Sequence, residues 1–194
     1  MKRLVERIAR VMAIMGGVVL TALVLLTCVS VLGRGLNTLG HSDMLTSLSQ
    51  WAADALIATG VGPLNGDFEL VEAGVAFSIF AFLPICQLYS SHATVDVFTN
   101  SLPPKVNKAI ITFWEVVLSA IILLITWRLF VGVQSKMAYG ETTFLLQFPV
   151  WWAYGLSFIA SAVASLIAIY CAVARVIELV TGRHILPHAG EAIH

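Results

Sequence analysis

Four long apolar segments, almost free of charged residues, decide what this chain can fold into. They cover Val11–Leu32, Leu70–Tyr89, Ala109–Trp127 and Thr142–Ala174, the last of which is interrupted by Pro149. A hydrocarbon core of about 30 Å requires about 20 residues of helix. Because lipid offers no hydrogen bonds to an exposed backbone, such segments must be helical, and they are too long for barrel strands. The sequence therefore predicts an all-α integral membrane protein with four transmembrane helices.

We place the spans at about residues 11–32, 70–89, 109–127 and 150–172, followed by a tail over residues 175–194. These spans use roughly 80 to 90 of the 194 residues, and the remainder is too little for a second globular domain. The whole chain is therefore predicted to be one membrane domain. The 11 basic residues balance the 11 acidic ones, so nothing indicates binding to nucleic acid.

Lysine and arginine are distributed unevenly between the two sides that four spans define. If the N-terminus is cytoplasmic, eight of the 11 basic residues fall on that side, and only Arg34, Arg128 and Lys136 fall outside. Basic segments tend to stay in the cytoplasm, so both termini are predicted to be cytoplasmic. The apolar run after the basic stretch Met1–Arg10 is longer than a usual signal-peptide core, so we expect the first helix to be retained.

The first outer loop, Gly33–Glu69, is the longest connection between spans. Ser42 and Asp43 are both residues that cap helices, and apolar residues follow them at helical spacing until Gly60. This pattern predicts a short helix lying on the membrane surface or against a partner. The alternative is a loop that packs on the outer ends of the spans.

One acid, Glu115, lies well inside a span. Acids within a membrane are costly and often functional, but near an interface such a group also serves to pair with a basic side chain or a neighbouring helix. None of the histidines lies in a span: they are His41, His92, His184, His188 and His194. Axial ligands of a membrane cytochrome would have to lie in the helices, so that class is disfavoured.

Three acids, Asp67, Glu69 and Glu72, gather where the second span begins. The macrodipole of a helix favours negative charge at its N-terminus, which is a sufficient structural reason for this cluster. Docking of a soluble partner or of a neighbouring subunit is also compatible with it.

Four sequence phrases together resemble one family of membrane proteins. They are Gly66–Leu70 (GDFEL), His92–Phe98 (HATVDVF, followed by Leu-Pro), Gly140–Thr143 (GETT) and Pro149–Tyr154 (PVWWAY). In this order and spacing, the chain is similar to the small membrane subunit of tripartite ATP-independent periplasmic (TRAP) transporters, the DctQ-like family. The first outer loop is longer than this family leads us to expect, so nothing is carried over for residues 37–64.

The resemblance implies an accessory subunit of a three-part importer in the bacterial inner membrane. In such importers a soluble periplasmic protein captures an organic anion, typically a carboxylate or a sulfonate. A large membrane subunit then moves the anion inward, usually driven by a sodium gradient. The small subunit is expected to brace the immobile part of the large one and to help dock the binding protein. It is not expected to be an enzyme or to hold a cofactor of its own.

Carried onto this sequence, the resemblance and the acid clusters predict a set of interface residues. They are Glu69, Glu72, His92, Asp96, Glu115, Gly140, Glu141, Thr142, Pro149, Trp151, Trp152 and Tyr154. Each also has a local alternative: Asp96 and Thr142 or Thr143 as helix caps, and Trp151 and Trp152 as anchors at the lipid interface.

Two other functions stay open at this point. The chain is alternatively a small homo-oligomeric transporter or channel that works through Glu115. A third possibility is a membrane anchor for a redox or signalling complex, which the lack of histidines in the spans disfavours.

Overall fold

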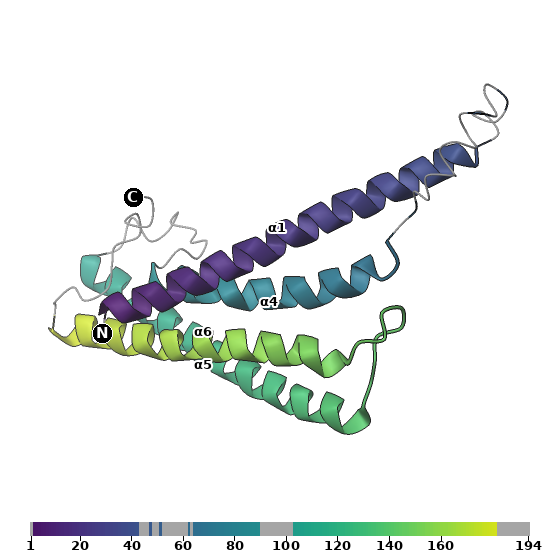
Figure 1. Ribbon diagram of the computed structural model, residues 1–194. Coiled ribbons are helices and arrows are strands. Elements are labelled where there is room, and N and C mark those ends of the chain that lie inside the picture. The colour runs from purple at the N-terminus through teal and green to yellow at the C-terminus, as the bar shows by residue number, and fades with distance from the viewer. Residues whose placement is uncertain are drawn as a thin grey trace.

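In the computed structural model, one long helix accounts for each of the four apolar segments (Figure 1). The structure describes residues 2–42, 47, 51, 62, 64–89 and 103–181. The helices are α1 (Lys2–Gly40), α4 (Asp67–Leu88), α5 (Pro104–Tyr139) and α6 (Val150–Thr181). All four are long and apolar enough to cross a membrane, which confirms the predicted fold class.

Two of the helices are much longer than the spans predicted within them. Helix α1 has 39 residues and α5 has 36, about 58 and 54 Å of helix. The predicted spans 11–32 and 109–127 are their inner parts, because the edge of an apolar run marks where charge begins and not where the helix ends. Helix α5 begins at Pro104 with Pro103 as its N-cap, a position that suits proline because the first N–H groups of a helix have no partner within it.

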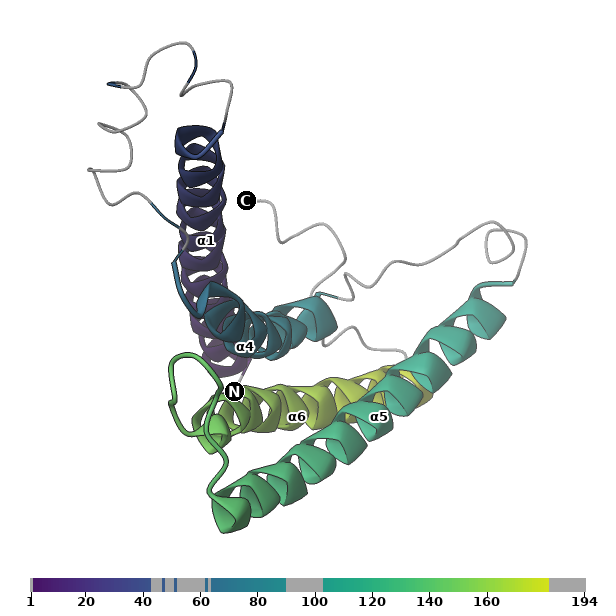
Figure 2. The same ribbon diagram turned by 90° about the vertical axis from the view of Figure 1, so that its right-hand side faces the viewer.

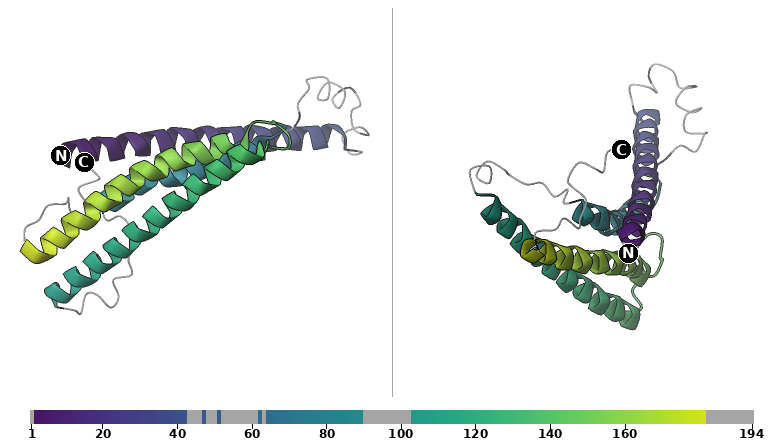
Figure 3. Two further views of the ribbon diagram at one scale, coloured as in Figure 1. Left: turned by 90° about the horizontal axis from the view of Figure 1, so that it is seen from below. Right: turned by 90° about the vertical axis from the view of Figure 1, so that its left-hand side faces the viewer.

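The four helices stand side by side in an open row and do not close into a bundle (Figures 2 and 3). Helix α4 packs between α1 and α6, and α6 packs between α4 and α5. Helices α1 and α6 barely touch, so α1 and α5 form the two edges of the row. The edge helices consequently expose apolar side chains along most of their length.

The two ends of the row differ in what they contain. At one end, here called the loop end, α4 begins and residues 140–149 connect α5 to α6. At the other, the terminal end, lie Lys2, Tyr89 and Thr181 (Figure 1). Both described ends of the chain therefore lie at the terminal end. That this end faces the cytoplasm stays a prediction.

Helix α6 is the most buried helix of the row. In its most apolar stretch 44% of the residues are buried, against 11% in α1 and in α5. Its buried residues are mostly small: Ser157, Ala160, Ser161, Ala164, Ser165, Ile167, Ala168, Cys171 and Ala174. Small side chains let helix backbones approach closely, which is how α6 contacts a helix on either side.

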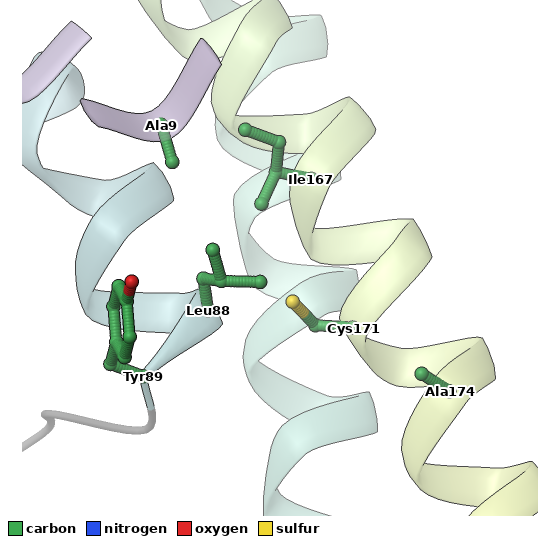
Figure 4. Close-up of a cluster of buried hydrophobic side chains, with 6 residues drawn as sticks. All are labelled: Ala9, Leu88, Tyr89, Ile167, Cys171 and Ala174. Carbon is green, nitrogen blue, oxygen red and sulfur yellow. The ribbon is translucent and has the colours of Figure 1, made fainter. Parts of the chain in front are cut away.

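A cluster of buried side chains joins three helices at the terminal end (Figure 4). Ala9 comes from α1, Leu88 and Tyr89 from the end of α4, and Ile167, Cys171 and Ala174 from α6. The Tyr89 hydroxyl donates a hydrogen bond of 3.0 Å to Glu6 Oε1. This cluster fixes the spacing of the row where α1 and α4 pack nearest to α6.

A glycine allows α1 and α4 to pack closely at mid-height. A Cβ added at Gly16 would lie 2.9 Å from the Ala81 Cβ, closer than real side chains approach. The Ser78 hydroxyl, buried beside it, donates to the Gly16 carbonyl oxygen at 3.3 Å. The neighbouring Gly17 has open space around it. Of these two adjacent glycines, only Gly16 is at a contact that requires a small residue.

Three of the predicted features lie on residues outside the described ranges. The surface helix of the first outer loop falls almost entirely there, and so do His92 and Asp96. These remain predictions.

Candidate functional site

The first turn of α4 carries a carboxylate that holds the loop between α5 and α6. The Glu69 side chain accepts a hydrogen bond from the Leu145 N–H at 2.7 Å and another from the Leu146 N–H at 3.0 Å. Each carboxylate oxygen takes one of these bonds, and the residue is only 6% exposed. Glu69 therefore fixes the backbone of a loop that lies 76 positions further along the chain.

Two residues earlier, Asp67 connects α4 to a different element. Its Oδ2 accepts a hydrogen bond of 2.5 Å from the Ser30 hydroxyl of α1, and the Arg34 guanidinium lies 3.8 Å away. Its Oδ1 accepts from the Phe68 N–H at 2.8 Å. Asp67 and Glu69 thus join three parts of the molecule at one point, which we call the loop-end junction: Ser30, Arg34, Asp67, Glu69 and residues 140–149.

The loop itself is closed by backbone hydrogen bonds. Gly140 ends α5 in the left-handed conformation, with φ of 62°. Thr142 and Pro149 form an antiparallel bridge, and the Thr143 N–H donates to the Phe148 carbonyl at 3.0 Å. The Thr143 hydroxyl accepts from the Phe148 N–H at 3.2 Å, so it serves the loop and not a helix end.

A glycine at the start of α4 makes room for the tip of this loop. Gly66 has φ of 82°, a left-handed conformation that strains any other residue. A Cβ at Gly66 would also lie 2.5 Å from the Leu146 Cγ. Two independent constraints therefore require glycine at this position.

Beside the loop-end junction, the structure contains a pocket of about 510 Å³. Its wall is mainly apolar, and it includes Glu72 of α4 and Tyr154 and Ser157 of α6. A volume of this size is within the range of small-ligand pockets and of clefts that accept side chains.

A second polar group lies toward the terminal end, inside the row. The Gln87 amide donates to Glu115 Oε1 at 2.7 Å and lies 3.5 Å from the Ser119 hydroxyl. The Ser119 hydroxyl in turn donates to the Ala168 carbonyl at 3.1 Å. Glu115 is 4% exposed. The group links α4, α5 and α6 through hydrogen bonds between side chains and to one backbone carbonyl.

The predicted interface residues thus divide into separate sets. Glu69, Gly140, Glu141, Thr142 and Pro149 meet at the loop-end junction.

Glu72 and Tyr154 line the adjacent pocket. Trp151 and Trp152 lie at the start of α6 with their rings edge to face, 6.1 Å apart. Glu115 is buried far from all of these.

The sequence of the chain matches a known protein family over most of its length. The model of the tripartite ATP-independent periplasmic transporter DctQ component matches residues 23–181, which include both polar groups. The chain belongs to the DctQ family. No curated protein and no solved structure gave a match. This DctQ protein is therefore a component of a TRAP transporter, as the sequence phrases predicted, and its family is one of transporter components and not of enzymes.

Sequence reasoning missed how Glu69 is used in this DctQ protein. Its partners are the backbone N–H groups of Leu145 and Leu146, which leave no signature in side-chain identity. The buried face of α6 was also missed, although it left a signal. Ser157, Ser161 and Ser165 recur every fourth residue, a spacing that places them on one face of a helix.

Within the described ranges, no group of three or more His, Cys, Asp or Glu side chains is placed to hold a metal ion. The expectation that coupling ions bind elsewhere, on the large subunit, stays a prediction.

Proposed function

We propose that this DctQ protein braces the large membrane subunit of a TRAP importer in the bacterial inner membrane and forms part of the docking surface for the periplasmic substrate-binding protein. The transported solute is an organic anion, a carboxylate or a sulfonate, and a sodium gradient acting on the large subunit drives its uptake. The chain itself moves no solute.

The open row of helices is the observation that carries this proposal. A closed four-helix bundle would bury its apolar faces against one another, but here α1 and α5 leave theirs uncovered at the edges. Because the row is one helix thick, it offers a wide apolar surface for a small number of residues. Such a surface suits a protein that enlarges the fixed part of a larger membrane machine and resists its tilting.

The loop-end junction supports the docking part of the proposal. Glu69 and the bridge between Thr142 and Pro149 fix the loop, while Phe144 at its tip is 87% exposed. Rigid backbone that presents an exposed aromatic side chain is what a recurrent protein contact requires, since little conformational entropy is lost on binding. By the charge distribution between the spans, the loop end faces the periplasm, where the binding protein is expected.

Affinity purification from the native membrane tests the proposal. The tagged chain is extracted in mild detergent, and the proteins that co-purify are identified by mass spectrometry. We expect a large many-helix membrane protein in a fixed ratio to this chain. Recovery of the chain alone, or only with copies of itself, would overturn the proposal. The homo-oligomeric alternative would then be tested by reconstituting the chain with Glu115→Gln in liposomes.

A further inference from the structure

The pocket beside the loop-end junction combines a mainly apolar wall with two polar side chains that have no hydrogen-bond partner among the described residues. Helices α4, α5 and α6 and the loop all contribute to it. Its lining residues are Phe68, Glu69, Glu72, Ala73, Ala76, Phe80, Leu129, Thr143, Phe144, Phe148, Val150, Ala153, Tyr154 and Ser157.

The first of these groups is Glu72. It is an exposed acid inside the predicted span 70–89, and the structure gives it no hydrogen bond or ion pair with any described residue. Asp67 and Glu69, in contrast, are both engaged in hydrogen bonds. An ionised side chain facing lipid is costly, so such residues usually pair with another group. A cation placed in the pocket would pair with this carboxylate.

The second group is the hydroxyl of Ser157, on the α6 side of the pocket. The residue is 2% exposed, and its Oγ has no hydrogen-bond partner in the part of the chain that the structure describes. Buried polar atoms without a partner are rare in folded proteins and call for an explanation. A ligand that enters the pocket with several N–H donors would satisfy both this oxygen and the Glu72 carboxylate.

We propose that this pocket receives a lysine or arginine side chain from a transmembrane helix of the large subunit. The cation pairs with Glu72, donates a hydrogen bond to Ser157, and lies among aromatic rings, including Phe80 and Phe148, that attract cations to their faces. This inference rests on the proposed function, because it assumes that the large subunit packs against this side of the row.

The depth of the site favours a side chain over the amine of a phospholipid. Glu72 is five residues past Asp67, so it lies about 8 Å along α4 from the helix start. The amine of a phospholipid is at the outer end of its headgroup and would have to sink below its own phosphate to reach this depth. A lysine or arginine on a packed helix reaches the same point through its flexible apolar stem.

Charge variants of Glu72 test the proposal in the assembled complex. Glu72→Lys should reduce the amount of large subunit that co-purifies by about 100-fold, and Glu72→Gln by about tenfold, because the partner's cation is left buried and unpaired. Glu178→Gln is the matched control. Glu178 is an acid at the terminal end that pairs with Arg175 and is not among the predicted interface residues, so its variant should retain the large subunit.

Ser157→Ala separates a role in binding from a role in folding. Because the Ser157 oxygen has no partner among the described residues, its removal should leave the thermal stability of the isolated chain unchanged or slightly raised. It should still weaken the complex several-fold. Equal loss of stability in the isolated chain and in the complex would contradict the proposal.

A crosslink identifies the occupant directly. Phe68 lines the pocket and is 57% exposed, so the photoreactive analogue p-benzoylphenylalanine can replace it with little disturbance. After irradiation of native membranes, we expect a crosslinked peptide from a large-subunit helix that contains lysine or arginine. Crosslinks to phospholipid alone would overturn the proposal. So would full retention of the large subunit by Glu72→Lys, whereas failure of the unmodified chain to capture any large subunit would overturn the proposed function itself.

Discussion

Two buried carboxylates, Glu69 at the loop end and Glu115 toward the terminal end, are held in opposite ways. Both are less than a tenth exposed. Glu69 accepts from two backbone N–H groups of a loop, whereas Glu115 accepts from the side-chain amide of Gln87 on another helix. The first therefore fixes the conformation of a loop, and the second fixes the distance between helices.

The difference shows where this DctQ protein can tolerate change. Any residue with a free N–H can stand at positions 145 and 146 if the loop keeps its shape, because the bonds to Glu69 use the backbone. At the terminal end, in contrast, the identity of Gln87 itself matters. The loop end is thus suited to vary its surface residues for different partners while its backbone stays in place.

Removing Glu69 should have the largest effect. In Glu69→Ala the N–H groups of Leu145 and Leu146 lose their charged acceptor, and we expect the melting temperature in detergent to fall by roughly 6–12 °C. Because the loop is then released, limited proteolysis should cut within residues 141–149. Glu69→Gln, which keeps one acceptor oxygen, should lose about half as much. An uncut loop in Glu69→Ala would show that the bridge between Thr142 and Pro149 holds it unaided.

Removing the Glu115 side chain should have the second largest effect on stability. Glu115→Ala removes the 2.7 Å hydrogen bond from the buried Gln87 amide, at a cost of about 2 kcal/mol, or roughly 4–8 °C in melting temperature. Glu115→Gln retains an acceptor oxygen and should melt close to the unmodified chain. In the assembled transporter, uptake by Glu115→Gln should also be unchanged. Loss of uptake with unchanged melting would instead favour the alternative in which Glu115 carries an ion.

Two glycines in the left-handed backbone conformation at the loop end can be compared with each other, and replacing either should destabilise the chain less than the loss of Glu69. Gly66 and Gly140 both have positive φ, but only Gly66 faces another side chain, that of Leu146. Gly140→Ala should cost about 1 kcal/mol from backbone strain alone, and Gly66→Ala about 2 kcal/mol. Thermal unfolding measures both. The double variant Gly66→Ala, Leu146→Ala should recover the difference, and equal costs at both sites would mean that the Leu146 contact is loose.

The features of this fold that the sequence could predict are those that depend only on the type and order of the side chains. The length of the apolar segments predicted the four helices. The acids at the start of α4 were explained by the helix dipole, but their actual partners, the Ser30 hydroxyl and the Leu145 N–H, lie far away in the chain. Such partners depend on the packing order of the helices.

That packing order itself has no clear marker in the sequence. All four helices are apolar around most of their circumference, because lipid or a partner covers the outer faces that water would cover in a soluble protein. Only the spacing of small residues, such as Ser161 and Ser165 on α6, distinguishes the buried side from the exposed one. An open row could therefore not be told from a closed bundle before the structure was known.

The smallest effect is expected at the ion pair between Lys136 and Glu141, which lies at the loop end but outside the network of Glu69. Both side chains are partly exposed, 29% and 45%, so water and salt screen their attraction. Glu141→Gln should change the melting temperature by less than about 2 °C, and raising the salt concentration should abolish even this difference. If Glu141→Gln instead destabilises the chain as strongly as Glu69→Ala, the ion pair at the start of the loop would hold its conformation as firmly as the Glu69 hydrogen bonds at its tip. The contrast between a backbone-held loop end and a side-chain-held interior would then no longer hold.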